Sequence, residues 1–128
     1  MTAVTGWSIL VVEDEPDGQE VVSSLLGNFN ISVETAFTAE AALNLLAQNT
    51  YTGVVVDLNL PGMDGLSLVK RIRENPTLAA IPCVAITAYH TSQVRHEAIA
   101  AGFNSYFPKP LEEIAFVREL QHLIGKTN

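Results

Sequence analysis

Two hydrophobic patterns alternate along the chain. Short runs rich in β-branched residues are separated by longer segments in which apolar residues have helical spacing. Within the short runs, such as Ile9–Val12 and Val54–Val56, apolar residues follow one another without polar interruption. Continuous apolar strands are typical of a sheet buried on both faces, and such sheets are usually parallel. The pattern predicts strands at Ser8–Val12, Ile31–Ala36, Gly53–Asp57, Pro82–Thr87 and Ser105–Phe107.

The segments between these strands carry helix signals. Apolar residues between positions 21 and 29 recur at a spacing that places them on one helical face. Thr38 and Asp64 favour helix N-caps, and Gly102 is a typical helix end. Pro110 is a favoured first-turn residue and predicts the start of the last helix. The predicted helices lie around residues 21–29 and at about 39–48, 65–74, 92–101 and 110–124.

Five repeats of strand and helix predict an α/β fold. Parallel neighbours need crossover connections, and these connections are right-handed. The expected product is a doubly wound (βα)5 open parallel sheet with helices on both faces. A chain of 128 residues is about one ordinary domain, so we expect a single domain over 1–128 and no output domain.

The chain has more acidic than basic residues, and this excess disfavours some classes of binding partner. Seven basic and fourteen acidic residues give a net charge of −7, which disfavours nucleic acid and anionic membranes as partners. No apolar run approaches the roughly 18 residues of a membrane span. The single cysteine, Cys83, cannot form an internal disulfide, so we expect a cytoplasmic protein with a buried, inert thiol. None of His90, His96 and His122 has a partner at metal-ligand spacing, and we expect solvated surface histidines.

Polar residues gather at the predicted carboxyl ends of the strands, where open α/β sheets bind ligands. Clustered carboxylates repel one another and favour a hard cation such as Mg²⁺, which prefers oxygen ligands. A carboxylate beside such a metal can attack a phosphoryl group, while an ammonium and a hydroxyl neutralise its oxygens. The residues at these strand ends are Glu13, Asp14, Glu15, Asp57, Thr87 and Lys109.

This set of residues resembles the receiver domain of two-component response regulators. The resemblance extends from about Ser8 to Ile124, which is the expected core of the domain. It implies a flavodoxin-like receiver fold with strand order 2-1-3-4-5. The matching stretches are Ile9–Glu15, Val56–Gly65, Ile86–Ala88, Ala101–Phe103 and Lys109–Pro110.

The resemblance implies a phosphoacceptor and a metal site. Asp57 corresponds to the aspartate that takes the phosphoryl group. Asp14 and Asp57 would hold Mg²⁺ directly, together with the backbone carbonyl of Asn59. Glu13 stands where aspartate is the commoner choice, and it would reach the metal largely through water.

The resemblance also implies residues that bind and sense the phosphoryl group. Thr87 would hydrogen-bond it and Lys109 would pair with it. Tyr106 corresponds to the switch aromatic, which turns inward when the threonine moves toward the phosphate. The peptide bond that joins Lys109 to Pro110 is expected to be cis, a geometry that is cheap only before proline.

Two positions tune the phosphoryl lifetime in the family, and one residue departs from its pattern. The tuning positions are Asn59 and Tyr89, and the bulky Tyr89 would shield the phosphoryl group from water. Pro108 removes a backbone donor from the fifth strand, which is tolerable if that strand is at the sheet edge.

The function that the resemblance implies is a phosphorylation-activated receiver. A histidine kinase or histidine phosphotransfer protein would supply the phosphoryl group. The fourth helix, fifth strand and fifth helix would then change shape and regulate a protein target, with the chain a monomer or a phosphorylation-dependent dimer. Beyond its own phosphotransfer and autodephosphorylation, such a domain is not an enzyme. Both a stand-alone regulator and a receiver from a hybrid kinase or longer regulator fit this sequence.

Two other function classes agree less well with the sequence. A pseudo-receiver would act as a phosphorylation-independent interaction module, but such domains commonly lose an acid, the threonine or the lysine, and this chain keeps them all. A Mg²⁺-dependent phosphohydrolase of the haloacid dehalogenase type needs Asp-x-Asp after the first strand. That place reads Glu13-Asp14-Glu15, and the residue two after Asp57 is asparagine.

Overall fold

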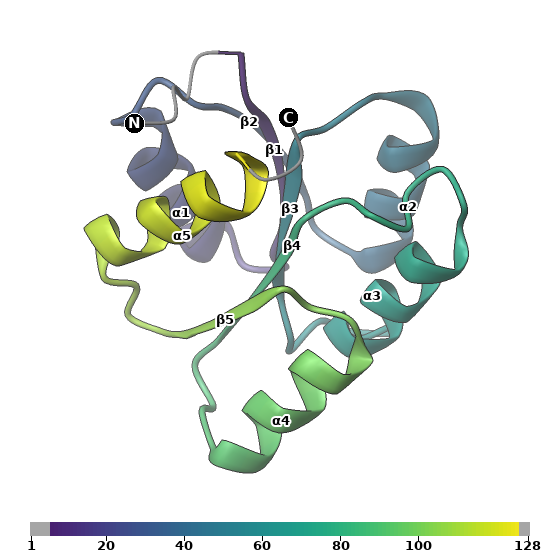
Figure 1. The fold of residues 1–128 in the computed structure, drawn as a ribbon. Coiled ribbons are helices and arrows are strands. Elements are labelled where there is room, and N and C mark those ends of the chain that lie inside the picture. Colours follow the sequence, from purple (N-terminus) through teal and green to yellow (C-terminus); the bar gives the residue numbers. More distant parts are fainter. Residues whose placement is uncertain (1–5, 126–128) are drawn as a thin grey trace.

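The computed structural model describes residues 6–125, and in this part of the chain five parallel strands form one sheet in the order β2-β1-β3-β4-β5 (Figure 1). The predicted α/β class and the strand order implied by the resemblance are both confirmed. The strands are β1 (Ser8–Val12), β2 (Ser32–Ala36), β3 (Gly53–Asp57), β4 (Cys83–Thr87) and β5 (Ser105–Pro108). The helices are α1 (Pro16–Gly27), α2 (Ala39–Gln48), α3 (Gly65–Glu74), α4 (Ser92–Ala101) and α5 (Glu113–Gly125).

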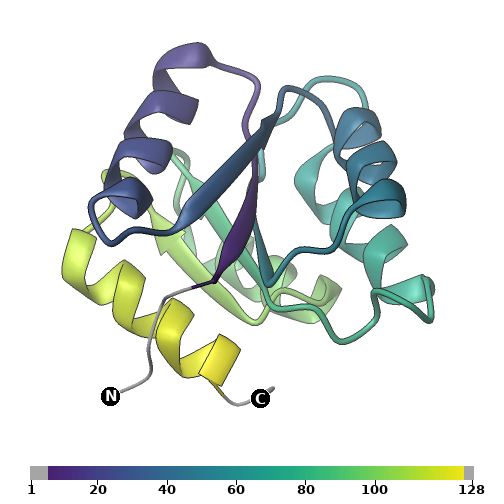
Figure 2. The same cartoon turned by 90° about the horizontal axis from the view of Figure 1, so that it is seen from above.

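The sheet separates two hydrophobic cores. Helices α1 and α5 cover one face, and α2, α3 and α4 cover the other (Figures 1 and 2). Successive residues of a strand point to opposite faces, so Leu10 and Val12 enter one core while Ile9 and Val11 enter the other. All four side chains are fully buried. The uninterrupted apolar runs are therefore explained by burial on both faces.

Helix caps confirm the two predicted N-cap residues, Thr38 and Asp64. The side chain of Thr38 accepts the backbone N–H of Ala41 at 3.0 Å, and Asp64 accepts that of Ser67 at 2.8 Å. These bonds satisfy backbone donors in the first turns of α2 and α3.

The predicted start of the last helix at Pro110 is wrong, because α5 begins at Glu113. The carboxylate of Glu112 accepts the N–H of Ala115 at 2.5 Å, and its carbonyl accepts that of Phe116 at 3.0 Å. Glu112 therefore caps the helix, and Pro110 lies in the preceding loop. The second and fourth strands each begin one residue later than predicted.

Two expectations from composition can be compared with the structure. Cys83 is fully buried, as predicted, and burial raises the pKa of its thiol to about 11. Within residues 6–125, no helix combines the length and the apolar character that crossing a membrane requires.

Arg73 of α3 ties three segments of the chain together. Its guanidinium donates hydrogen bonds to the carbonyls of Gly102 at 2.9 Å and Ile81 at 2.6 Å. It also donates to the side-chain oxygen of Asn104 at 2.8 Å, and that same oxygen accepts the N–H of Cys83. The residue thus fixes the end of α4 and the start of β5 against β4, and β5 leads into the loop that carries Lys109.

We predict that Arg73→Ala lowers the free energy of unfolding by about 2–3 kcal/mol, because several main-chain acceptors lose a charged donor. Urea unfolding followed by circular dichroism measures the change. Arg71→Ala is the matched control, since Arg71 is an exposed residue of the same helix. Equal unfolding free energies for the two variants would show that the Arg73 bonds do not stabilise the fold.

Candidate functional site

The strand register brings the candidate residues to one edge of the sheet. Val12 of β1 lies opposite Val56 of β3, so Glu13 and Asp57 follow at the same level. Thr87 at the end of β4 lies opposite Pro108 of β5. The N–H of Lys109 donates to the carbonyl of Thr87 at 2.8 Å, which holds the lysine loop against β4.

β5 is an edge strand, and this explains why Pro108 is tolerated. The peptide bond between Lys109 and Pro110 is cis, the geometry that the resemblance implies.

Lys109 lies between two buried carboxylates. Its Nζ is 2.7 Å from Oε1 of Glu13 and 2.6 Å from Oδ2 of Asp57. Glu13 is 1% exposed and Asp57 is 5% exposed, while the Lys109 side chain keeps 26% of its surface in solvent. The two acids come from neighbouring strands, and their mutual repulsion is offset by the ammonium that they share.

Burial and charge shift the ionisation of this group. Burial raises the pKa of Glu13 above its usual value of 4.5; the bond from Lys109 lowers it, and the nearby Asp57 raises it. Burial would lower the pKa of Lys109, but its bonds to Asp57 and Glu13 raise it above its usual value of 10.5. The lysine therefore stays protonated beside Asp57 at neutral pH.

Asn59 connects Asp57 to Thr87. Its backbone N–H donates to Oδ1 of Asp57 at 2.8 Å, and its side-chain amide donates to Oγ1 of Thr87 at 3.2 Å. The same hydroxyl oxygen accepts the N–H of Tyr89 at 3.0 Å. Thr87 is 1% exposed, whereas the side chain of Tyr89 is 72% exposed. The Thr87 hydroxyl is thus fixed beside the loop that follows Asp57.

Tyr106 of β5 is buried, and its hydroxyl reaches the loop between β4 and α4. Its oxygen lies 2.8 Å from Nδ1 of His90 in a hydrogen bond, and the two ring centroids are 5.4 Å apart. His90 is exposed, as expected from the sequence, and it also makes this hydrogen bond to Tyr106. Burial raises the pKa of the Tyr106 hydroxyl, so it is protonated at neutral pH.

Three acidic residues after β1 offer oxygen ligands for a metal ion. One carboxylate oxygen from each of Glu13, Asp14 and Glu15 lies within 4.8 Å of the others. Glu13 also lies beside Asp57, because both bind Lys109. A set of carboxylate oxygens at a partly solvated edge suits Mg²⁺, which prefers oxygen ligands and keeps several waters.

Two supporting residues were missed by the sequence analysis. Gln19 is buried, and its side-chain amide donates to the backbone carbonyl of Glu13 at 2.9 Å. Gly65 begins α3 so close to β3 that a Cβ there would lie 2.8 Å from the carbonyl oxygen of Asp57. Each fixes backbone next to a candidate site residue. A lone Gln or Gly in the first turn of a helix gives no sequence signal for this role.

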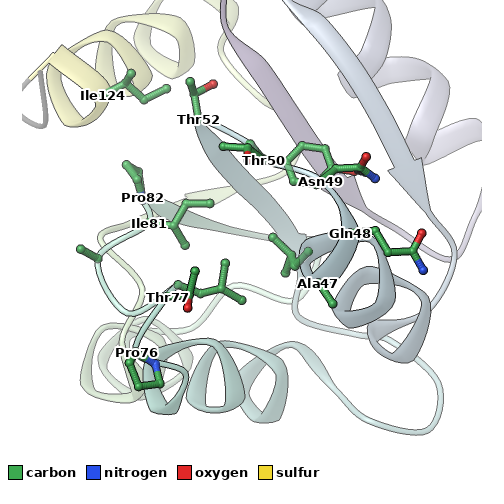
Figure 3. Close-up of a pocket in the computed structure, with 14 residues that line it drawn as sticks. Ala47, Gln48, Asn49, Thr50, Thr52, Pro76, Thr77, Ile81, Pro82 and Ile124 are labelled. Atoms are coloured by element: carbon green, nitrogen blue, oxygen red, sulfur yellow. Dashed lines mark hydrogen bonds between the residues drawn. The ribbon is translucent and has the colours of Figure 1, made fainter.

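A cavity of about 510 Å³ lies away from these residues (Figure 3). Its lining comes mainly from the loop before β3 and the loop before β4, which are at the amino ends of the strands. Apolar and uncharged polar side chains line it, including Thr52, Thr77 and Ile81. None of the strand-end residues singled out above contributes to it.

Comparison with known proteins gives the following matches. The family model of the response regulator receiver domain matches residues 9–121. An uncharacterized 14.6 kDa protein of Leptolyngbya boryana is 35% identical over 94% of this chain and 92% of its own length. Sensor histidine kinase RcsC of Salmonella typhimurium is 33% identical over 80% of this chain, which spans only 11% of that kinase.

Solved structures have the same fold. The crystal structure of a protein described as a response regulator, from Chloroflexus aurantiacus, has a TM-score of 0.90 at 28% identity. The match covers 93% of this chain and 98% of the other. The receiver domain of sensor histidine kinase PA1611 from Pseudomonas aeruginosa has a TM-score of 0.87 at 30% identity, covering 94% and 99%. That structure has a magnesium ion coordinated in its active site cleft.

We predict that Lys109→Ala destabilises the metal-free protein by about 2 kcal/mol at neutral pH, because two buried carboxylates lose their shared cation. Breaking a fully buried pair costs roughly 3–5 kcal/mol, and the partial exposure of Lys109 reduces this. Chemical unfolding in chelator measures the loss. Lys70→Ala, at an exposed site of α3, is the control and should change little.

The same variant should show a defined pH dependence. Without Lys109 the contact that lowers the pKa of Glu13 is gone, so the folded-state pKa rises further above 4.5. When a carboxyl has a higher pKa in the folded than in the unfolded state, the protein loses stability as the pH rises from the unfolded-state pKa through the folded-state pKa. The free energy of unfolding of Lys109→Ala should therefore come closer to that of the parent as the pH is lowered from 8 to 5. A deficit that is constant with pH contradicts the assignment.

Proposed function

Because the chain belongs to the response regulator receiver domain family, we propose that it accepts a phosphoryl group on Asp57 from the phosphohistidine of a histidine kinase or histidine phosphotransfer protein. One observation carries this proposal. Asp57 is a buried carboxylate at the carboxyl end of the sheet, and it has an ammonium 2.6 Å away. An incoming dianionic group at that carboxylate would find a cation already in place.

The chemistry needs one bond to form and one to break. A carboxylate oxygen of Asp57 attacks phosphorus, the new O–P bond forms, and the electron pair of the N–P bond returns to the imidazole of the donor. The Lys109 ammonium and the Thr87 hydroxyl are the chain's own donors for the phosphoryl oxygens. Both are held at the same edge, because the N–H of Lys109 is bonded to the carbonyl of Thr87.

The donor set fits Mg²⁺. Asp14, Asp57 and the backbone carbonyl of Asn59 would hold the ion directly, and Glu13 would act through water. The ion would offset negative charge on the phosphoryl oxygens when bound. Glu13 is bonded to Lys109, which supports its assignment to an indirect role.

The conformational change that would regulate a protein target begins at Thr87. Movement of Thr87 toward the phosphoryl group would break its bond from Asn59 and open space beside β5. Tyr106 and the α4-β5-α5 face would then change and regulate a protein target in the cytoplasm, with the chain a monomer or a phosphorylation-dependent dimer. The chain would catalyse its own phosphotransfer and autodephosphorylation, and no reaction on a separate substrate.

Incubation with acetyl phosphate and Mg²⁺, followed by intact-mass spectrometry, tests the proposal. We predict one added phosphoryl group on the parent and none on Asp57→Asn. Asp64→Asn is the control, because Asp64 is an exposed helix cap and asparagine caps equally well. A parent that gains no mass under conditions that label a known receiver would favour the phosphorylation-independent interaction module.

We predict that Mg²⁺ raises the melting temperature of the parent, since the ion binds the folded site and has little affinity for the unfolded chain. When the Mg²⁺ concentration is a hundred times the dissociation constant, the free energy of unfolding increases by about 2.7 kcal/mol. Asp57→Asn should gain less, because one direct ligand is lost. Thermal melts in chelator and in millimolar Mg²⁺ measure both gains, and equal gains would place the ion elsewhere.

A further inference from the structure

The carboxylate of Glu13 occupies the space where a side chain at position 18 would stand. Gly18 is the third residue of α1 and is half-buried. A Cβ built there would lie 2.3 Å from Oε1 of Glu13, 2.7 Å from its Cδ and 2.9 Å from its Cγ. Non-bonded atoms do not approach this closely, so any larger residue at position 18 must displace the Glu13 side chain.

Glu13 has little freedom to give way. Its side chain is 1% exposed, and Oε1 accepts a hydrogen bond from Lys109 at 2.7 Å. Its Oε2 accepts the N–H of Glu15 at 3.3 Å, and its backbone carbonyl accepts the amide of Gln19 at 2.9 Å. Displacing the carboxylate would therefore break its bond to the lysine that also binds Asp57.

Backbone conformation does not explain the glycine. Gly18 is absent from the positive-φ glycines, so other residues could adopt its backbone geometry. Glycine inside a helix costs about 1 kcal/mol relative to alanine. The space taken by Glu13 is the feature of this position that excludes a side chain.

We propose that Gly18 is a positioning residue for the phosphoacceptor site, paired with the long side chain at position 13. The missing side chain lets Glu13 lie against the first turn of α1, where it holds the Lys109 ammonium next to Asp57. An aspartate at position 13 is one methylene shorter and would not need this space. The consequence for metal binding rests on the proposed function, whereas the packing of Glu13 on Gly18 does not.

A double-mutant cycle tests the pairing. The proteins are the 128-residue parent, Gly18→Ala, Glu13→Asp and the double variant, each melted in chelator. Gly18→Ala should lower the melting temperature by roughly 5 °C through the displaced Glu13. Glu13→Asp should lower it in the parent but raise it in the Gly18→Ala background, since the shorter acid relieves the clash.

Gly27→Ala is the matched control. Gly27 lies in the same helix, and a Cβ there meets no atom within 4 Å. This variant should melt no lower than the parent. A fall equal to that of Gly18→Ala would show that the effect belongs to the helix rather than to Glu13.

Mg²⁺ titration calorimetry adds a readout that packing alone would not move. Gly18→Ala should weaken Mg²⁺ binding about tenfold, as expected when a residue that acts through water is displaced. The double variant should return to within about threefold of the parent, and Gly27→Ala should not change. A parent that binds no Mg²⁺ contradicts the proposed function, while the melting cycle still decides the pairing.

Two results would overturn the pairing. One is a Glu13→Asp substitution that lowers the melting temperature equally in both backgrounds. The other is failure of both Gly18→Ala and the double variant to fold, because position 18 would then be restricted by something other than Glu13. A double variant that folds where Gly18→Ala does not supports the pairing.

Discussion

The contact of Lys109 with Glu13 and Asp57 is the interaction on which the candidate site depends. Two buried carboxylates at the ends of adjacent strands would repel each other strongly without a cation between them. The fold supplies that cation from the far edge of the sheet, through the loop after β5. The sheet register and the backbone bond from Lys109 to Thr87 place the ammonium at this edge.

Two separate sets of hydrogen bonds lie around the proposed phosphoacceptor and the proposed output face. Asn59 bonds both Asp57 and Thr87, and Tyr106 of β5 bonds His90 in the loop between β4 and α4. Arg73 anchors the end of α4 and the residue before β5, so the elements on both sides of Tyr106 are held from α3. In the proposed function, a change at Thr87 would reach Tyr106 and His90 through side-chain movement, because Arg73 holds the backbone of the neighbouring elements.

Sequence patterns predicted the fold because strands buried on both faces leave uninterrupted apolar runs such as Val54–Val56. They also placed Asp57, Thr87 and Lys109 at strand ends, since the carboxyl ends of parallel strands share one edge. They did not predict that Glu13 binds Lys109, because that contact depends on how far the lysine side chain reaches past the two strands, β3 and β4, that separate β5 from β1. The start of α5 was misplaced because proline marks a permitted first turn, whereas the Glu112 carboxylate makes the actual cap.

The most direct measurement of the central claim is a crystal structure with Mg²⁺ and beryllium trifluoride, a mimic of the phosphoryl group. The account predicts the mimic on Asp57, with Nζ of Lys109 moved from Glu13 to a fluoride and the Thr87 hydroxyl turned from Asn59 toward it. A mimic bound at another carboxylate, or Lys109 still bridging Glu13 and an unmodified Asp57, would contradict the account.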